Sequence, residues 1–457
     1  MANDIESSQS TCSEIETSDS VTEDYECKAI VEALNTAAKL RIDSLWSAKW
    51  CIFRVPKVLQ RHKPEAYRPH VVSIGPFHHR GEQFQPIQAV KQWYLHNLLS
   101  LRNMSLKTLI QGIDNISEFE KRARECYAEP LDLNHDEIIE MMVIDGCFLI
   151  ELFRKHFYWS CRKVIKKDLV PAEELNIDKD PIFNMDCMLQ YIFQDLMLLE
   201  NQLPWFVLEC LFGLTLEKHV SYSLNELVLV AFRSQRSLAC KLEFYLRHTN
   251  DDDGDEVLHI LDLVRSATTY GFKNRELITS SELILPPATL LSKAGIKFIE
   301  STDCGIMDMD FKDGVFAIPQ LSIIESTEPL LRNLIAFEQC CQGRSPKVTS
   351  YVSIMNSLIT TSKDMDLLCR KGIIRHYDPM FFNKLLNDTK LNNFYFTGLC
   401  NEVNKHYIVS WNKWLEKLKR DYFSNPWAIT SLVAASIFLV LTLLQTTYTI
   451  RQYYSPR

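Results

Sequence analysis

The chain has 457 residues, 46% hydrophobic and 24% charged, which excludes a wholly disordered or collagen-like protein. With only 13 Gly and 17 Pro it is poor in helix breakers, so it favours a mainly α (α+β) fold and is a weak candidate for a glycine-rich phosphate loop. The net charge of −8 comes from eight acids within residues 1–26. The rest balances at 50 acidic and 50 basic residues, so no nucleic-acid partner is expected.

Residues 1–28 predict an acidic disordered tail. The segment is rich in Ser, Thr and acids, and no Lys or Arg precedes Lys28. It has neither a cationic start nor an apolar stretch, which argues against a secretory signal or a transit peptide. Apolar spacing over Ala29–Leu45 predicts the first helix of a mainly helical domain covering 29–424.

The next elements are predicted from breakers and apolar spacing. Cys51–Pro56 is predicted to be extended before a short helix, and Pro69–Ile74 to be a strand that ends at Gly75-Pro76. Pro86 opens an amphipathic helix to about Leu101, and Ser117 starts a charged helix. The expected core contacts of the longer helix are Val90, Trp93, Tyr94, Leu95 and Leu98.

Three apolar helices are predicted in the middle of the chain, over His135–Phe157, over Met185–Leu199 and from Pro204 onward. Asp145 and Glu151 disqualify the first of them as a membrane span. The polar run 247–256 predicts a break and an internal boundary.

From residue 281 the pattern changes. Pro286-Pro287 opens a short helix that Gly295 closes. Short alternating runs then predict a small antiparallel β-sheet near 296–324, with a hairpin at Asp313-Gly314. Thr327-Glu328-Pro329 is expected to cap the following helix, and helical patterns continue to Lys419.

Residues 427–450 predict one transmembrane helix, followed by a short tail over 451–457. These 24 residues carry no charge, and as a helix they would extend about 36 Å, enough to cross a hydrocarbon core of about 30 Å. The alternative is a buried soluble helix, but such a helix keeps a polar stripe more often than this segment does. Insertion is expected to be post-translational, as for a tail anchor, with the lipid bilayer as a partner. The membrane would be the plasma membrane or an endomembrane.

The flanking charges predict the topology. Four basic residues precede the span, and only two follow it; in chain order they are Lys413, Lys417, Lys419, Arg420, Arg451 and Arg457. The larger number on the near side predicts a cytoplasmic domain. Three N-x-S/T sequons, at Asn103, Asn115 and Asn387, would favour the opposite orientation if they carried sugar. The 14 dispersed Cys lack metal-ligand spacing and are read as reduced core thiols.

Five short motifs, in order, carry a family resemblance. They are Cys51–Pro56, Ser73–His79, Asp145–Phe148, Leu199–Pro204 and Asn333–Gln339. With Asn425-Pro426-Trp427 before the span, the chain from about residue 46 resembles the plant proteins grouped as domain of unknown function 247. It departs from the common pattern at Phe77, Arg80 and Trp205. The resemblance implies an uncharacterised plant membrane protein with a C-terminal anchor and no established reaction; some relatives are proposed recognition determinants in self-incompatibility.

No motif predicts a catalytic residue, a cofactor or a metal site. The motif positions whose role stays open are Arg54, Pro56, Ser73, Gly75, Pro76, His78, His79, Asp145, Glu200, Asn201, Gln202, Pro204, Asn333 and Glu338. The two adjacent histidines could bind metal or act in catalysis, although loop-stabilising hydrogen bonds are the commoner use. The polar groups between apolar helices form either an acid–base or recognition site or a network that ties helix ends together. Arg54 is expected to pair with one of the acids.

Two hypotheses follow. The first is a membrane-anchored interaction module with an unknown protein partner, with an extracellular receptor-like variant as an alternative. The second is an enzyme whose site is built from His78, His79, Glu200 and Asp145. Geometry separates them, because an enzyme site requires these side chains to converge in an open pocket.

Overall fold

A computed structural model describes most of the chain. The described residues are 49–164, 177–216, 222–233, 245, 256–270, 285–301, 305–375, 378, 380–391, 393–409 and 426–454. The chain divides into two units, Met1–Trp50 and Cys51–Arg457, and nearly all described residues belong to the second. The predicted acidic tail, the helix over Ala29–Leu45 and nearly all of the polar break lie outside the described residues.

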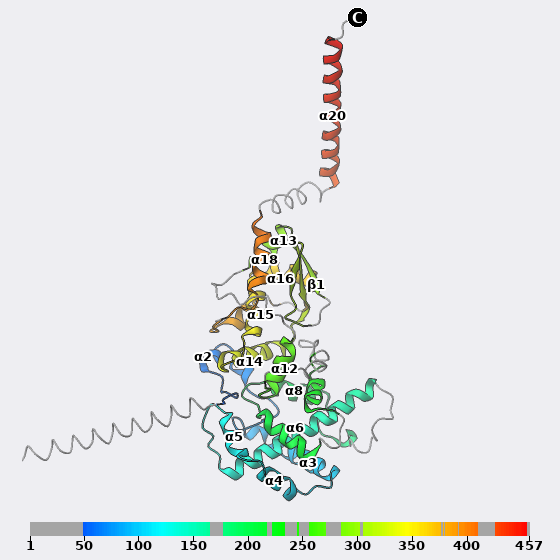
Figure 1. The fold of residues 1–457 in the computed structure, drawn as a ribbon. Helices are drawn as coiled ribbons and strands as arrows, with labels where there is room; N and C mark the ends of the chain where they lie inside the picture. The colour runs from blue at the N-terminus through cyan, green and yellow to red at the C-terminus, as the bar shows by residue number, and fades with distance from the viewer. Residues whose placement is uncertain are drawn as a thin grey trace, which may run out of the picture. The chain divides into compact units, whose positions relative to one another are not determined.

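Helices make up the N-terminal part of the second unit, which confirms the mainly helical class (Figure 1). The α-helices are α2 (Lys57–Gln60), α3 (Gln85–Leu101), α4 (Leu106–Asp114), α5 (Phe119–Glu125), α6 (His135–Val164), α8 (Asp186–Asp195), α9 (Trp205–Thr215) and α10 (Leu224–Phe232). The 3-10 turns are η1 (Pro64–Tyr67), η2 (Glu82–Phe84) and η3 (Ile177–Lys179). The helix predicted over Met185–Leu199 is shorter than expected, since α8 ends at Asp195.

α6 is the central element of this part. It packs against α3, α9 and α10, and its middle is buried on every side. Phe148 meets Tyr94 of α3 edge-on at 5.1 Å, and Phe153 stacks on Phe193 of α8 at 6.5 Å between ring centroids. Burying each such side chain contributes about 1.5–3 kcal/mol. This 30-residue helix has a mostly apolar middle and is stabilised by the helices that cover it, as the sequence predicts for a buried helix.

The C-terminal part adds a second set of helices. They are α12 (Ile260–Thr269), α13 (Ala288–Lys293), α14 (Thr327–Cys340), α15 (Lys347–Leu358), α16 (Ser362–Arg370), α17 (Phe381–Leu386) and α18 (Thr397–Ile408). α13 follows Pro287 and is closed by Gly295, as predicted. The cap predicted at Thr327 is wrong, because Thr327 is the first residue of α14. Its hydroxyl donates to the Ser322 carbonyl instead.

The small sheet lies where the sequence predicts it, but its strand directions differ. Its strands β1 (Lys297–Ser301), β2 (Asp310–Lys312) and β3 (Val315–Pro319) have the order β1-β3-β2. The β2–β3 hairpin turns at Asp313 and Gly314, both with positive φ as a type I′ turn requires. β1 is parallel to β3, so the sheet is mixed and not antiparallel. β3 lies in the centre of the sheet, with its hairpin partner β2 on one side and β1 on the other, so β1 has the opposite direction to β2.

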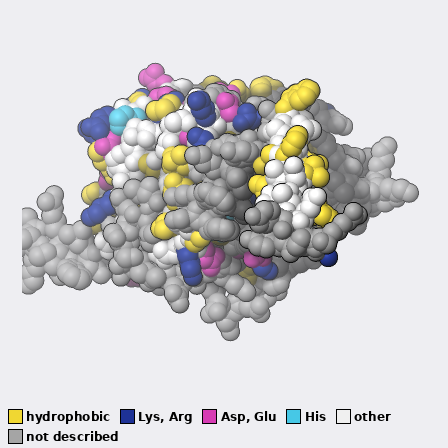
Figure 2. Space-filling model, turned by 90° about the horizontal axis from the view of Figure 1, so that it is seen from above, with side chains coloured by type: hydrophobic (Ala, Val, Ile, Leu, Met, Phe, Trp, Pro, Cys, Tyr) yellow, Lys and Arg dark blue, Asp and Glu magenta, His cyan; other side chains and the backbone are white. Residues whose placement is uncertain are grey.

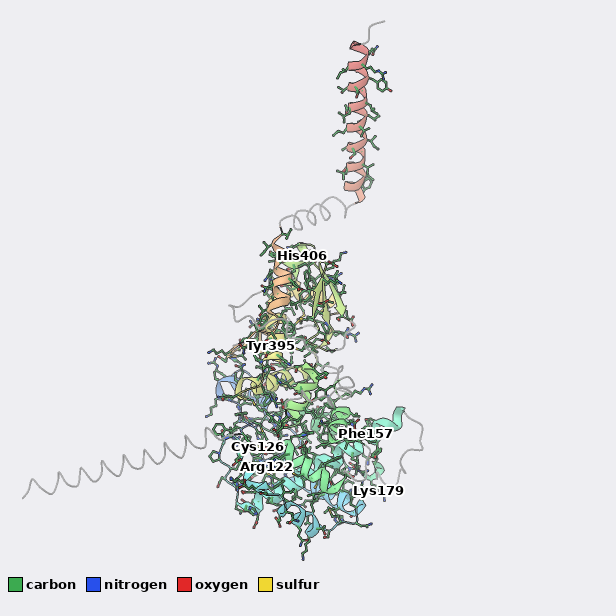
Figure 3. The ribbon with its side chains drawn as sticks, in the orientation of Figure 1. Arg122, Cys126, Phe157, Lys179, Tyr395 and His406 are labelled. Carbon is green, nitrogen blue, oxygen red and sulfur yellow. The ribbon has the colours of Figure 1, made fainter. Side chains whose placement is uncertain are left out.

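Two further features complete this region. β4 (Leu321–Ser322) pairs in parallel with β5 (Ile374–Arg375), a contact that the sequence analysis did not predict. His406 of α18 packs edge-on against Phe311 of β2, with 5.6 Å between ring centroids (Figure 3). A Cβ on Gly314 would come within 3.1 Å of that imidazole, so glycine allows the hairpin and α18 to approach closely.

The last described element is α20 (Pro426–Tyr454). Its stretch Thr430–Gln452 is long and apolar enough to cross a membrane, and it is exposed along its whole length. Figure 2 shows hydrophobic side chains (yellow) on the face seen from above. α20 covers the whole of the helix predicted over 427–450, so the helical part of that prediction is confirmed.

Candidate functional site

Residues 69–76 are held in place by side chains from distant elements. The sequence predicts a strand over Pro69–Ile74, and this prediction is wrong, because the segment pairs with no strand among the described residues. The Asp195 carboxylate accepts hydrogen bonds from the backbone N–H groups of residues 70, 71 and 72, at 2.7–2.9 Å. A carboxylate thus takes the place that a neighbouring strand would have in a sheet.

Asn201 and Gln202, in the corner between α8 and α9, continue this arrangement. The Asn201 amide accepts from Ile74 N–H at 2.7 Å and donates to the carbonyls of Val72 and Asp195. The Gln202 amide donates to the carbonyls of Leu196 and Leu198. It also accepts from Leu261 N–H of α12 at 3.2 Å. Both side chains are buried, so each bond replaces one to water. The bonds to Val72, Ile74 and Leu261 join segments far apart in the sequence, whereas the others stay within the corner itself.

Asp145 and Lys91 form an ion pair inside the protein. Their side chains are 1% and 0% exposed, and 2.6 Å separates the carboxylate oxygen from Nζ. The other Asp145 oxygen accepts from Gly75 N–H at 2.9 Å, and Lys91 also donates to the Ser73 carbonyl. The pair therefore holds the loop against α3 and α6 at the same time.

Glu200 joins the beginning of the described chain to this loop. Its Oε1 accepts from Val55 N–H at 2.9 Å and from the Gln60 amide at 3.0 Å. Its Oε2 lies 3.2 Å from His78 Nε2 and 3.7 Å from the Arg54 guanidinium. Arg54 pairs more closely with Glu129, at 2.9 Å. Arg54 thus lies near a motif acid, Glu200, as expected, but the distance between them is longer than that to Glu129.

The remaining motif residues divide between two places. Asn333 of α14 accepts from Leu199 N–H at 2.9 Å and donates to the Ala66 carbonyl at 2.8 Å, so it belongs to the same network. Glu338 does not, because it accepts from Arg265 of α12 and from the first turn of α15. Pro56 and Pro204 directly precede α2 and α9, and Pro76 follows Gly75 in the loop.

The four residues of the enzyme hypothesis do not form one site. His79 and Asp145 line a cavity of about 330 Å³, whereas His78 and Glu200 face each other and do not line it. Both carboxylates already accept backbone N–H groups, which orients them as structural acceptors. Within the described ranges, no group of three or more His, Cys, Asp or Glu is placed to hold a metal ion.

Gly75 shows how tightly the network is packed. Its φ is +72°, and a Cβ there would lie 2.5 Å from the Gln202 carbonyl oxygen. We expect Gly75→Ala to lower the free energy of unfolding by about 2–4 kcal/mol, from left-handed strain together with the clash. Chemical denaturation would measure the loss. Gly343→Ala is the matched control, because Gly343 has a φ of +91° and open space around it. Equal losses in both variants would mean that the contact with Gln202 contributes nothing.

Lys91 and His259 are important residues that the sequence analysis missed. Lys91 interrupts the apolar stripe Ile87, Tyr94 and Leu98 of α3, and that charge within the stripe was an available signal. The sequence contains no comparable signal for His259. It caps α12 by accepting from Asp262 N–H, and its other ring nitrogen lies 3.1 Å from the Cys51 carbonyl.

Burial lowers the pKa of His259 to about 3. In the unfolded chain the imidazole takes up a proton below about pH 6.5, so between these values the unfolded state binds more protons. We expect stability to fall as the pH is lowered, by about 2 kcal/mol from pH 7 to pH 5 through this residue. Denaturation midpoints of the wild type and of His259→Gln across this range test it. The variant should show the weaker pH dependence, and identical slopes would contradict the assignment.

Comparison with known proteins points to one family. A model of the family described as "Plant protein of unknown function" (DUF247) matches residues 52–441. Two Arabidopsis thaliana proteins are similar over most of the chain. The UPF0481 protein At3g47200 is 26% identical, over 92% of this chain and 90% of its own. The putative UPF0481 protein At3g02645 is 22% identical, over 89% and 92%. No solved structure matches.

Proposed function

Because the chain belongs to the DUF247 family of plant proteins, for which no reaction is known, we propose that it is a membrane-anchored interaction module. In this proposal α20 crosses the bilayer, and the helical body over 51–409 offers a surface to a protein partner. The motif residues favour an interaction role over catalysis. Glu200, Asn201 and Asp145 make hydrogen bonds inside the protein, and among the described residues the motif side chains do not come together as a catalytic group.

The observation that carries the proposal is how α20 satisfies its own polar groups. Between Trp427 and Ile450 it has no charged residue. Hydroxyls of this helix donate to carbonyls in its preceding turn, as Ser436 does to Leu432 at 2.8 Å, Thr446 to Thr442 at 2.7 Å and Thr449 to Gln445 at 2.8 Å. In hydrocarbon there is no water to bind these groups, so a helix that pairs them internally suits lipid on all sides.

The proposed orientation is cytoplasmic. Four basic residues precede α20 within the run 413–420, whereas two follow the apolar stretch. The extracellular alternative has one observation in its favour, because Asn103 and Asn115 are exposed and could accept sugar. On the face that Figure 2 shows, Lys and Arg (dark blue) are interspersed with Asp and Glu (magenta). Such a mixed surface suits a protein partner better than nucleic acid.

Protease protection tests the orientation. The full chain, tagged before residue 51, would be treated with protease in sealed, cytoplasm-side-out microsomes. We expect the body to be digested without detergent. Protection until detergent is added, together with a mass decrease after removal of N-glycans, would establish the extracellular alternative. Proximity labelling from the native membrane would then test the interaction role, which is contradicted if no partner is enriched over a control fused to α20 alone.

A further inference from the structure

Three exposed lysines lie around the β2–β3 turn. Lys312 precedes the turn, and Lys297 begins the edge strand β1, where its N–H donates to the Gly314 carbonyl at 2.8 Å. Lys405 comes from α18, next to His406, whose imidazole lies against the same turn (Figure 3). None of the three lysines forms an ion pair within the described part of the chain. The turn is therefore surrounded by positive charge that no carboxylate of the fold balances directly.

Apolar side chains continue this surface at the end of α18. Ile408 is 68% exposed and Val409 is 45% exposed, although most large apolar side chains of the body are buried. We call this surface the hairpin end of the body and define it by residues 297, 312–314 and 405–409. Exposed apolar groups beside unpaired cations suit the boundary of a membrane, where acyl chains lie below charged headgroups.

Negative charge is scarcer than positive charge at the hairpin end. Asp313 lies in the turn and is exposed, so three lysines and one aspartate give this surface a net charge of +2. Asp310 and Glu402 lie further along β2 and α18, and each already interacts with another group. The whole chain has a net charge of −8, so an anionic surface attracts the hairpin end more than the remainder of the chain. Such a charge distribution favours one orientation of the body at an anionic membrane.

The chain also keeps the hairpin end close to α20. The 16 residues 410–425 connect α18 to α20, and they carry four basic and two acidic residues. A segment of this length reaches at most about 55 Å, even when it is fully extended. When α20 spans a bilayer, the hairpin end meets that bilayer at an effective concentration in the millimolar range. Contacts that are weak individually are then sufficient to dock it.

We propose that the hairpin end of the body rests on anionic lipid headgroups of the bilayer that holds α20. Each lysine near an anionic surface favours the docked state by about fivefold, so Lys297, Lys312 and Lys405 together contribute about a hundredfold. Ile408 and Val409 would lie at the boundary between headgroups and acyl chains. This inference rests on the proposed membrane anchor and specifies which surface of the body meets the lipid.

Acetylation of lysines in lipid nanodiscs tests the proposal. The full chain would be inserted into nanodiscs of phosphatidylcholine, alone or with about 30% phosphatidylglycerol, which is anionic and has no amine that consumes reagent. An uncharged acetylating reagent and mass spectrometry then give the reaction rate of each lysine. We expect Lys297, Lys312 and Lys405 to react at least about threefold more slowly with the anionic lipid, and about 0.5 M salt to remove the difference. Lys57 and Lys107, which are exposed on α2 and α4, should react at the same rate in both lipids.

Charge reversal identifies the residues that are responsible. In the double variant Lys312→Glu with Lys405→Glu, the protection of Lys297 should be lost, because the surface then repels anionic headgroups. Lys57→Glu with Lys107→Glu is the matched control, since it changes the net charge equally but away from the hairpin end. It should leave the protection of Lys297 intact. All four substituted side chains are exposed, so neither double variant should change the melting temperature by more than a few degrees.

The possible failures separate this proposal from the proposed anchor. Equal rates at the three lysines in both lipids, while the chain remains in the nanodiscs, would contradict the docking and leave the anchor intact. Protection that is the same in both lipids and survives salt would show that headgroup charge is not what the hairpin end recognises. Loss of protection in both double variants would contradict the role of the hairpin end. Failure of the chain to copurify with nanodiscs of either composition would contradict the anchor itself, and the docking with it.

Discussion

Replacing Lys91 by methionine should lower the free energy of unfolding by about 3–5 kcal/mol, because it leaves the Asp145 carboxylate charged, buried and unpaired. Methionine keeps most of the length of the side chain, so little of this loss would come from a cavity. The Ser73 carbonyl would also lose the donor that Lys91 provides. Urea unfolding of the full chain in detergent, followed by tryptophan fluorescence, measures the effect.

A second substitution tests whether the buried charge is the cause. Asp145→Asn keeps an acceptor for Gly75 N–H but removes the charge. In the double variant Lys91→Met with Asp145→Asn, we expect part of the lost stability to return. If the two substitutions add without interaction, or if Lys91→Met alone costs less than about 1 kcal/mol, the ion pair does not stabilise the loop as we describe.

Placing two arginines in the middle of α20 should release the protein from membranes. At the centre of a spanning helix each arginine costs about 2.5–3.5 kcal/mol, so Val440→Arg with Leu444→Arg opposes insertion by about 5–7 kcal/mol. Flotation through a density gradient would report the fraction that remains with lipid. Gln452→Arg is the control, since an arginine near the helix end can reach the interface and should not alter flotation. Equal flotation of all three proteins would exclude α20 as the membrane segment.

The helices were predictable because their signals are local. Pro86 and Pro204 mark the starts of α3 and α9, and the mostly apolar stretch from Ile138 to Phe153 identifies α6 as buried. The β2–β3 hairpin follows from Asp313-Gly314, since few other pairs adopt positive φ at both positions. These features depend on neighbours along the chain and need no knowledge of tertiary contacts.

The features that the sequence could not predict depend on contacts between residues that are far apart along the chain. Residues 69–74 have the pattern of a strand, but their N–H groups bind Asp195 and Asn201, more than 120 residues away. The parallel pairing of β1 with β3 is likewise a contact between segments that are not adjacent along the chain. Glu200, Asn201 and Gln202 form one motif in the sequence, but the sequence does not show that each side chain binds a different segment. Hydrogen-bond partners of this kind become visible only in three dimensions.

The most direct test of the account is alkaline carbonate extraction of the native, full-length protein, because the central claim is that α20 lies in lipid and holds the helical body at the membrane. Peripheral proteins are released at high pH, whereas a helix long enough to cross a hydrocarbon core of about 30 Å stays in the bilayer. We predict that the protein remains in the membrane pellet and enters the soluble fraction only with detergent. Release of the intact chain by carbonate alone would contradict the account.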